Sequence, residues 1–386
     1  MVIFYVWTDT QLLNCVNVKS NFYDNEKAIL IVWKLKRVSD FIIDTIREKN
    51  IFEKIIYLVP PHYYFERKRV GLIENLQSLV NGKRLRKDIE TKLQCELGNC
   101  RVDKFITAAF WSESLMVYRY IKRYNFNIDI YFIEEGLACY NSPKGWLYKT
   151  SPSFSFKAKI REIMYYWNWT IKAQKSVKGI YLYAPYCNNG NLKMPLIKMP
   201  QITLKNSTTY KILEKVSDSR ANEYSKRRIY YIADAPHSGE LLYDNQFNKE
   251  LSMILKCVPE ENVCVKMHPL METENLLKTR YKEVWFDDSG VTMPQRLLNL
   301  DVDKKIFICG MSSTVFELKN SFGKTPYIIF TYRLINTISK SSIERMDNFV
   351  KKFIMNYGNA SKIAIPNTEQ EFSDMLMNII LQCEEL

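Results

Sequence analysis

The sequence is poor in the residues that build metal centres and disulfide frameworks. It has only three histidines in 386 residues, and no two of its nine cysteines have the CxxC spacing. Zinc clusters need closely spaced thiolates and imidazoles, so we expect no metal site. An odd number of scattered cysteines is typical of reduced, buried thiols in a cytoplasmic protein.

Long apolar runs and export signals are also lacking. No stretch reaches the ~18 uncharged apolar residues that a membrane-spanning helix needs. The N-terminal segment 1–7 has no basic region ahead of its apolar residues, which predicts a strand and not a signal peptide. We therefore expect a cytoplasmic location.

Glycine is scarce, and the phosphate-binding signatures GxGxxG and GxxxxGK[ST] do not occur. The motifs of RNP domains, helix-turn-helix proteins and zinc fingers do not occur either, so nucleic acid is not an expected partner. The net charge of +13 nevertheless implies an acidic partner, either nucleic acid, a phospholipid surface or an anionic substrate. Positive charge gathers at 67–69 and 83–87, and a solvated basic face is the plain alternative.

The residues that are present alternate between strand and helix patterns in both halves of the chain. A length of 386 residues exceeds what one core usually serves, so we expect two domains. Alternation of this kind predicts parallel sheets with right-handed crossovers. The predicted fold class is α/β of the GT-B architecture, two Rossmann-like domains facing each other across a cleft. Its parts are residues 1–183, an interdomain connection at 184–226, and residues 227–386.

Two helical patterns carry further expectations. Residues 69–80 and 82–95 predict two helical stretches beside the basic clusters. Residues 157–173 predict a basic amphipathic helix with tryptophans, which packs on its own domain or lies on a membrane surface. The segment 105–110 fits a strand or a helix.

Two acids follow the predicted strand 128–133. Glu134 and Glu135 end this apolar run and Gly136 comes directly after them. In open α/β sheets ligands bind at the carboxyl ends of the strands, so both acids are placed for chemistry. Glycine allows a sharp turn and a close approach of substrate. Solvated acids before a turn are the plain alternative.

Two further predicted strands end in functional groups. His268 follows strand 262–267, and Pro269 stops the pairing there. Strand 305–309 is followed by Gly310, by the hydroxyl residues Ser312, Ser313 and Thr314, and by a predicted helix. Amides and hydroxyls at a helix start favour an anion. The plain alternatives are a structural histidine and an ordinary N-cap. A further acidic segment, 286–290, lacks a strand pattern and is expected to be a loop.

The order and spacing of Glu134-Glu135-Gly136, His268-Pro269 and Ser312-Ser313 resemble the bacterial sialyltransferases of GT-B type. Those enzymes carry an acidic-acidic-Gly motif, an HP motif and a serine pair. The resemblance is closer to the lipooligosaccharide and capsule sialyltransferases of glycosyltransferase family 52 and the related family 38 polysialyltransferases. The opening segment 7–13 looks like the start of family 52. Residues 293–295 depart from the relatives, which often have an acid after the proline near the nucleotide.

The resemblance implies transfer of sialic acid from CMP-sialic acid with inversion, without a metal or another cofactor. The general base would be Glu135, with Glu134 and Asp234 as alternatives. His268 would meet the departing phosphate, which Ser312 and Ser313 would hold. The further candidates for donor contacts in these motifs are Lys266, Pro269, Gly310 and Thr314.

The expected acceptor is an anionic or galactose-terminated glycan, either lipooligosaccharide or capsule, of a bacterial surface. The basic clusters would bind this acceptor or make a peripheral contact with the anionic inner face of the membrane. A GT-B enzyme that uses another nucleotide sugar is the nearest alternative. A basic nucleic-acid-binding protein is the alternative from another class, and salt-dependent DNA affinity would identify it.

Overall fold

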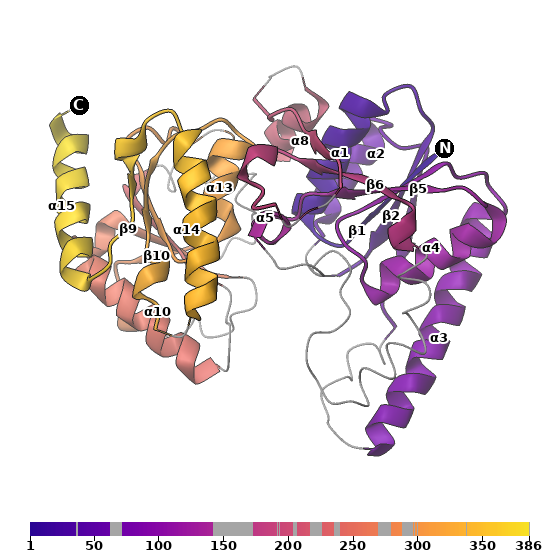
Figure 1. Ribbon diagram of the computed structural model, residues 1–386, viewed down its shortest axis with the longest axis horizontal. Helices are drawn as coiled ribbons and strands as arrows, with labels where there is room; N and C mark the ends of the chain where they lie inside the picture. The colour runs from indigo at the N-terminus through magenta and orange to yellow at the C-terminus, as the bar shows by residue number, and fades with distance from the viewer. Residues whose placement is uncertain are drawn as a thin grey trace. The chain divides into compact units, whose positions relative to one another are not determined.

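The protein forms two compact units, each built around one parallel sheet (Figure 1). The computed structural model describes residues 1–35, 38–61, 72–141, 173–190, 192, 194–203, 207–216, 226–234, 240–268, 279–287, 296, 298, 300–336 and 338–385. The first unit comprises Met1–Glu135, Ser142–Pro185 and Gly190–Pro200. The second comprises Gly136–Asn141, Tyr186–Asn189 and Gln201–Leu386.

The sheet of the first unit is parallel throughout, in the order β3-β2-β1-β4-β5-β6-β7. Its strands are β1 (Val2–Val6), β2 (Ala28–Trp33), β3 (Lys54–Leu58), β4 (Lys104–Thr107), β5 (Asp129–Ile133), β6 (Val177–Leu182) and β7 (Leu196–Lys198). The order reverses between β1 and β4, the switch point at which open α/β sheets bind ligands. The ambiguous segment 105–110 is therefore a strand in its first half.

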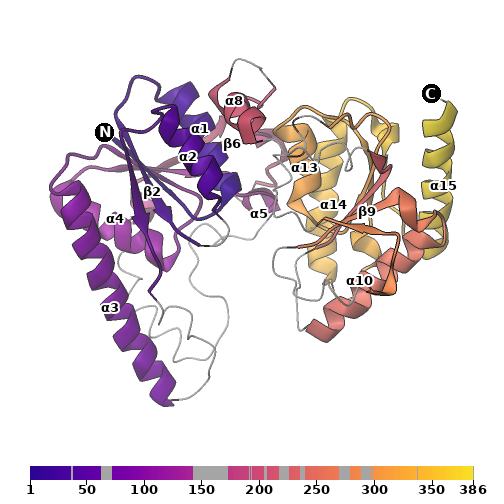
Figure 2. The ribbon, with the colours of Figure 1, turned by 180° about the vertical axis from the view of Figure 1, so that it is seen from behind.

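Among the described residues, helices cover both faces of this sheet, with α1 and α2 on one face and α3 and α4 on the other (Figure 2). They are α1 (Asp9–Phe22), α2 (Asp40–Glu48), α3 (Leu72–Leu97) and α4 (Ser112–Tyr124). The two helical stretches predicted at 69–80 and 82–95 are one helix, α3. Its buried stripe of Leu85, Ile89, Leu93 and Leu97 repeats every four residues and faces α4.

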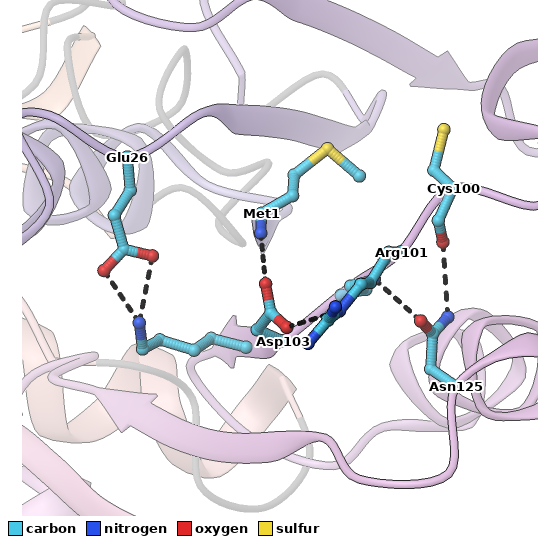
Figure 3. A network of polar contacts seen from close by, with 8 residues as sticks. Met1, Glu26, Cys100, Arg101, Asp103 and Asn125 are labelled. Atoms are coloured by element: carbon cyan, nitrogen blue, oxygen red, sulfur yellow. Dashed lines mark hydrogen bonds and ion pairs between the residues drawn. The ribbon is translucent and has the colours of Figure 1, made fainter.

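A polar network closes the amino-terminal edge of this sheet, as Figure 3 shows. The Met1 amino group pairs with Asp103, which also lies 3.3 Å from the Arg101 guanidinium. Asn125 accepts a hydrogen bond from the Val102 N–H at 2.8 Å and donates one to the Cys100 carbonyl. These contacts join β1 to β4 at the edge opposite the acidic motif, so they stabilise the sheet away from the candidate chemistry.

The sheet of the second unit repeats the plan in the order β10-β9-β8-β11-β12-β13, again all parallel. Its strands are β8 (Ile229–Ile232), β9 (Val263–Lys266), β10 (Trp285–Phe286), β11 (Ile306–Cys309), β12 (Tyr327–Phe330) and β13 (Ile363–Ala364). Its helices are α5 (Ala138–Asn141), α8 (Thr208–Val216), α10 (Glu240–Leu255), α13 (Ser313–Asn320), α14 (Lys340–Met355) and α15 (Glu369–Glu385), with 3-10 turns at Glu260–Asn262, Tyr332–Leu334 and Ala360–Lys362. A further 3-10 turn, Pro185–Cys187, lies on the border of the two units.

Alternate residues of the second sheet face two different helix pairs, as the period of a strand requires. Tyr231 and its neighbours on one face belong to a core with residues of α10 and α15. On the other face the Phe330 ring stacks on Phe316 of α13 at 5.2 Å, and Phe316 meets Phe349 of α14 at 4.7 Å. The sheet is therefore covered on both sides, which explains why its strands are almost uniformly buried.

The predicted α/β class is confirmed, and the structure can be compared with several predictions for individual segments. The stretch 184–226, predicted as a connection, contributes β7 to the first sheet and α8 to the second unit. The predicted helix at 157–173, except its last residue, and the basic cluster 67–69 lie outside the described residues. In the part of the chain that the structure describes, no helix is both long and apolar enough to cross a membrane.

Candidate active site

Glu134, at the carboxyl end of β5, is a structural anchor. Its side chain is only 4% exposed, and its Oε2 accepts the Tyr183 N–H at 2.8 Å. Its own N–H donates to the Tyr181 carbonyl at 3.0 Å, so backbone and side chain both bind the strand β6 segment. The Glu134 residue therefore links the carboxyl end of β5 to the segment of β6. Its role as general base, the alternative to Glu135, remains a prediction.

Glu135 is held by a side chain that follows β1. Gln11, in the first turn of α1, donates from Nε2 to Glu135 Oε1 at 2.5 Å. The Gln11 side chain is fully buried, and its Oε1 accepts the Trp7 N–H at 2.9 Å. The start of α1 is itself fixed by the N-cap residue Thr8, whose hydroxyl accepts the Gln11 N–H. Glu135 is therefore oriented by a residue that the sequence did not single out.

Gly136 carries the acidic motif into the second unit, where it lies against Ser313. Its φ of +100° is a conformation that disfavours side chains. A Cβ at this position would lie 2.8 Å from Ser313 Cβ and 2.9 Å from Ser313 Oγ. Glycine is therefore required both by the backbone and by the close approach of the serine motif.

Asp234 follows β8 at the switch point of the second sheet, where the strand order reverses between β8 and β11. Its two carboxylate oxygens accept the Met311 N–H at 3.0 and 2.8 Å. Gly310 makes room for this contact, because a Cβ there would lie 2.0 Å from Asp234 Oδ2. Gly310, predicted to contact the donor, thus lets Asp234 hold the loop that leads into the serine motif.

Burial and a second acid raise the pKa of Asp234 to about 7. Burial is the larger cause, the negative charge of Glu250 adds to it, and the bond from Met311 acts in the opposite direction. Glu250 is only 4% exposed and accepts hydrogen bonds from the Tyr231 hydroxyl at 2.5 Å and the Thr331 hydroxyl at 2.7 Å. Burial raises the pKa of Glu250 as well. Asp234 therefore holds the serine loop while it interacts with a second, buried carboxyl group.

The hydroxyl residues lie where the sequence placed them, at the start of α13. Ser312 is the N-cap residue, yet its hydroxyl makes no capping hydrogen bond with the helix. The side chains of Ser312, Ser313 and Thr314 are all partly exposed. The first turn of an α-helix has amide groups without helical partners, and together with hydroxyl groups these suit an anion such as a phosphate.

His268 lies two residues beyond the end of β9 and is partly exposed, whereas Pro269 lies outside the described residues. Lys266, the last residue of β9, has its Nζ 3.0 Å from Asp287 Oδ2. The ammonium of this predicted donor contact is therefore engaged within the protein.

The expectation that the acidic segment 286–290 has no strand context is wrong, while its residues 288–290 lie outside the described part of the chain. Trp285–Phe286 forms β10, which pairs in parallel with β9. Asp287 follows it and accepts two bonds from Arg296, Nε at 3.0 Å and Nη2 at 2.8 Å. Both side chains are almost fully buried. The strand was missed because it has only two residues, too few for a periodic pattern.

A polar stripe on α1 was a signal that the sequence offered. The stripe consists of Gln11, Asn14 and Asn17, which recur at every third residue and are all buried. An amphipathic helix normally buries apolar side chains on such a face. Asn14 donates to the Glu134 carbonyl at 3.0 Å and accepts the Tyr183 hydroxyl at 2.9 Å. Amides on a buried helix face indicate polar partners on the neighbouring strands.

Among the described residues, no group of three or more His, Cys, Asp or Glu side chains could hold a metal ion. Metal independence itself remains a prediction.

A family model described as alpha-2,8-polysialyltransferase matches residues 2–326, which include all three motifs. The chain belongs to the alpha-2,8-polysialyltransferase family. This membership confirms the predicted resemblance to bacterial sialyltransferases and makes the protein a glycosyltransferase. A polysialyltransferase of this family takes a nucleotide-sugar donor and a glycan acceptor. A search of curated proteins finds no match.

Solved structures with the same fold place this polysialyltransferase family member in the GT-B class. UDP-GlcNAc 2-epimerase from Neisseria meningitidis, bound to UDP-GlcNAc, superimposes with a TM-score of 0.52 at 12% identity, over 99% of this chain and 100% of its own. The 2-epimerase from Methanocaldococcus jannaschii gives 0.51 at 11% identity, over 98% and 92%. TcCGT1 in complex with UDP gives 0.51 at 10% identity, over 100% and 94%. At these identities the likeness concerns the fold alone.

Proposed function

We propose that this polysialyltransferase family member transfers sialic acid from CMP-sialic acid, with inversion and without a metal, to a hydroxyl of a bacterial surface glycan. The main support for this proposal is that all three motifs follow strands at the carboxyl edges of their sheets. Glu135 follows β5, His268 follows β9, and the serine pair follows β11. Ligands of open α/β sheets bind at such edges.

Glu135 is the proposed general base. It removes the proton from the acceptor hydroxyl as that oxygen attacks the anomeric carbon of sialic acid. Its carboxylate accepts a hydrogen bond from Gln11, which favours the ionised form that a base requires. Asp234 is the weaker candidate, because its carboxylate is occupied with the Met311 N–H and the pKa of its buried group is raised.

The donor phosphate is proposed to bind the second unit. The first-turn amides of α13 and the hydroxyls of Ser312, Ser313 and Thr314 donate to its oxygens. His268 hydrogen-bonds or protonates the phosphate as the bond to sialic acid breaks and the electron pair leaves with CMP. Lys266 contributes through its positive charge while it remains paired with Asp287.

The acceptor is proposed to be an anionic or galactose-terminated glycan of lipooligosaccharide or capsule. Lys83, Arg84 and Lys87 are exposed on α3 of the first unit and suit a polyanion. The same charges suit the anionic inner face of the bacterial membrane, where a cytoplasmic enzyme of this kind would work as a peripheral protein.

Another nucleotide sugar is the second candidate donor, because the structures of the same fold were solved with UDP-GlcNAc and with UDP. Calorimetric titration with CMP, UDP and GDP distinguishes the two. We expect CMP to bind and UDP and GDP not to bind. Turnover of CMP-sialic acid in EDTA, with the anomeric configuration of the product read by NMR, then tests metal independence and inversion. Binding of UDP in place of CMP, or a strict need for a divalent cation, would overturn the proposal.

A further inference from the structure

We propose that Gln11 is a positioning residue for catalysis, which fixes the orientation and the ionised state of Glu135. The inference rests on the proposed role of Glu135 as general base. It is carried by one chain of contacts within the first unit, from the Trp7 N–H to the Gln11 side chain and on to the Glu135 carboxylate.

The direction of the Gln11 amide is determined by its partners. The Trp7 N–H can only donate, so the atom that meets it at 2.9 Å is the carbonyl oxygen Oε1 of Gln11. The amino group Nε2 therefore faces Glu135 Oε1, at 2.5 Å. An amide donor at this distance requires an acceptor oxygen, and the hydrogen bond is stronger when that oxygen belongs to an ionised carboxylate.

Helix α1 cannot shift to release this contact, because an amide ladder holds it to the neighbouring strands. The ladder consists of Gln11, Asn14 and Asn17, all less than 5% exposed. Asn14 binds the Glu134 carbonyl and the Tyr183 hydroxyl, and Asn17 Nδ2 donates to the Pro200 carbonyl at 2.9 Å. Buried amides that lost these partners would each leave an unsatisfied polar group, so the ladder fixes the position of α1.

Gln11 and Glu135 belong to segments that are not adjacent in the sheet. β4 lies between β1, which precedes the helix that carries Gln11, and β5, which precedes Glu135. The hydrogen bond therefore joins two segments that strand pairing alone does not connect.

The expected chemical effect is on the pKa of Glu135. A hydrogen bond donated to the charged form of a carboxyl group favours that form. Ionisable groups on the neighbouring elements include Asp9 and Lys19 on α1, Glu113 and Arg119 on α4, and Glu134 and Tyr183 beyond the ends of β5 and β6. Asp9 accepts the Ser39 N–H and Glu134 accepts the Tyr183 N–H, so these two carboxylates have backbone partners of their own. Gln11 is thus a side-chain donor directed at Glu135.

The test combines activity and stability measurements on the full chain. In Gln11→Leu we expect kcat to fall about tenfold or more, the loss for one hydrogen bond to a charged group, with the donor KM unchanged. The acidic limb of the kcat–pH profile should move up by about one pH unit. Ser20→Ala, a change of a partly exposed polar side chain on the same helix outside the amide ladder, is the control and should leave both unchanged.

A second experiment exchanges the amide and the carboxylate between positions 11 and 135. It tests the contact through protein stability, independently of whether Glu135 is the general base. Gln11→Glu places two carboxyl groups together and should lower Tm increasingly as pH rises. Adding Glu135→Gln restores an amide–carboxylate pair and should recover most of Tm but none of the turnover. A wild-type pH profile and kcat in Gln11→Leu, or no recovery of Tm in the exchange variant, would refute the inference. Normal turnover in Glu135→Gln alone would instead refute the base assignment.

Discussion

The carboxylate of Asp234 occupies the space that a side chain at position 310 would need. A Cβ built on Gly310 would lie 2.0 Å from Asp234 Oδ2 and 2.7 Å from Ile335 Cδ1. The same carboxylate accepts the Met311 N–H through both oxygens. The acid and the glycine are therefore one structural unit that sets the path of the loop before the serine motif.

This relationship predicts non-additive effects on stability. Gly310→Ala should strongly lower the free energy of unfolding, because a carboxylate and a methyl group both stand in the way. Asp234→Ala removes one of the two obstacles, so the double variant should lose less than the sum of the single losses. Chemical denaturation of the four proteins measures this coupling. Strict additivity would show that the loop relaxes away from Asp234.

The raised pKa of Asp234 predicts how stability depends on pH. A folded-state pKa of about 7, against 3.8 for the ordinary carboxyl group, means that folding favours the protonated form. Its contribution is present below pH 4 and is lost as pH rises through 7. Asp234→Asn cannot ionise, so its Tm relative to wild type should rise between pH 4 and pH 8. A constant difference in Tm between the variant and wild type across that pH range would contradict the raised pKa of Asp234.

The base assignment predicts a loss of rate without a loss of donor binding. Glu135→Gln should lower kcat by roughly 10²-fold or more, as removal of a general base does. CMP affinity should hardly change, because the donor groups belong to the second unit. Steady-state kinetics and CMP calorimetry measure the two quantities. Near-normal turnover would transfer the role to Glu134 or Asp234.

The donor motif predicts the complementary pattern. Ser312→Ala and Ser313→Ala should each weaken CMP binding by about 1 kcal/mol, if each hydroxyl gives one hydrogen bond to a phosphate oxygen. His268→Ala should lose CMP affinity and turnover together, since the ring acts before and during departure. Thr208→Ser, a change on α8 outside the motifs, serves as the control. Unchanged CMP affinity in all three motif variants would show that the phosphate does not bind at the start of α13.

The basic cluster on α3 makes a prediction about the acceptor. Changing Lys83, Arg84, Arg86 and Lys87 to Ser should raise KM for a long anionic glycan and leave the donor KM unaltered, with an effect that shrinks as salt rises. A membrane role would instead leave the KM of a dissolved acceptor unaltered and abolish sedimentation with anionic vesicles.

The control for this charge change lies in the second unit. Lys256, Lys282, Lys304 and Lys351 are exposed there, and their change to Ser removes the same charge. Equal effects of both quadruple variants would indicate a general charge effect and no acceptor surface.

The sequence predicted the elements whose cause is local. Uniform apolar runs such as β1 and β11 formed strands as expected, because a buried strand is visible in neighbouring residues. The three motifs were likewise found at strand ends. Their order along the chain, together with the alternation of strands and helices, was enough to predict the GT-B class.

Contacts between distant segments were not predictable in the same way. Gln11 and Glu135 are 124 residues apart, and Asp234 and Met311 are 77 apart. Neither pair shares a helix face or a strand register that periodicity could reveal. Asp287 was assigned to a loop because its strand has two residues, and only the sheet shows that β9 lies beside it.

The amide ladder of α1 also sets an order of events during synthesis. Helix α1 is synthesised before one of its partners, because the Pro200 carbonyl that Asn17 binds lies 183 residues later in the chain. At about 5–20 residues per second, roughly 10–40 s separate a completed helix from its last partner. Throughout that interval water must satisfy the amides that end up buried. The orientation of the acidic motif is thus completed only after most of the first unit has been translated.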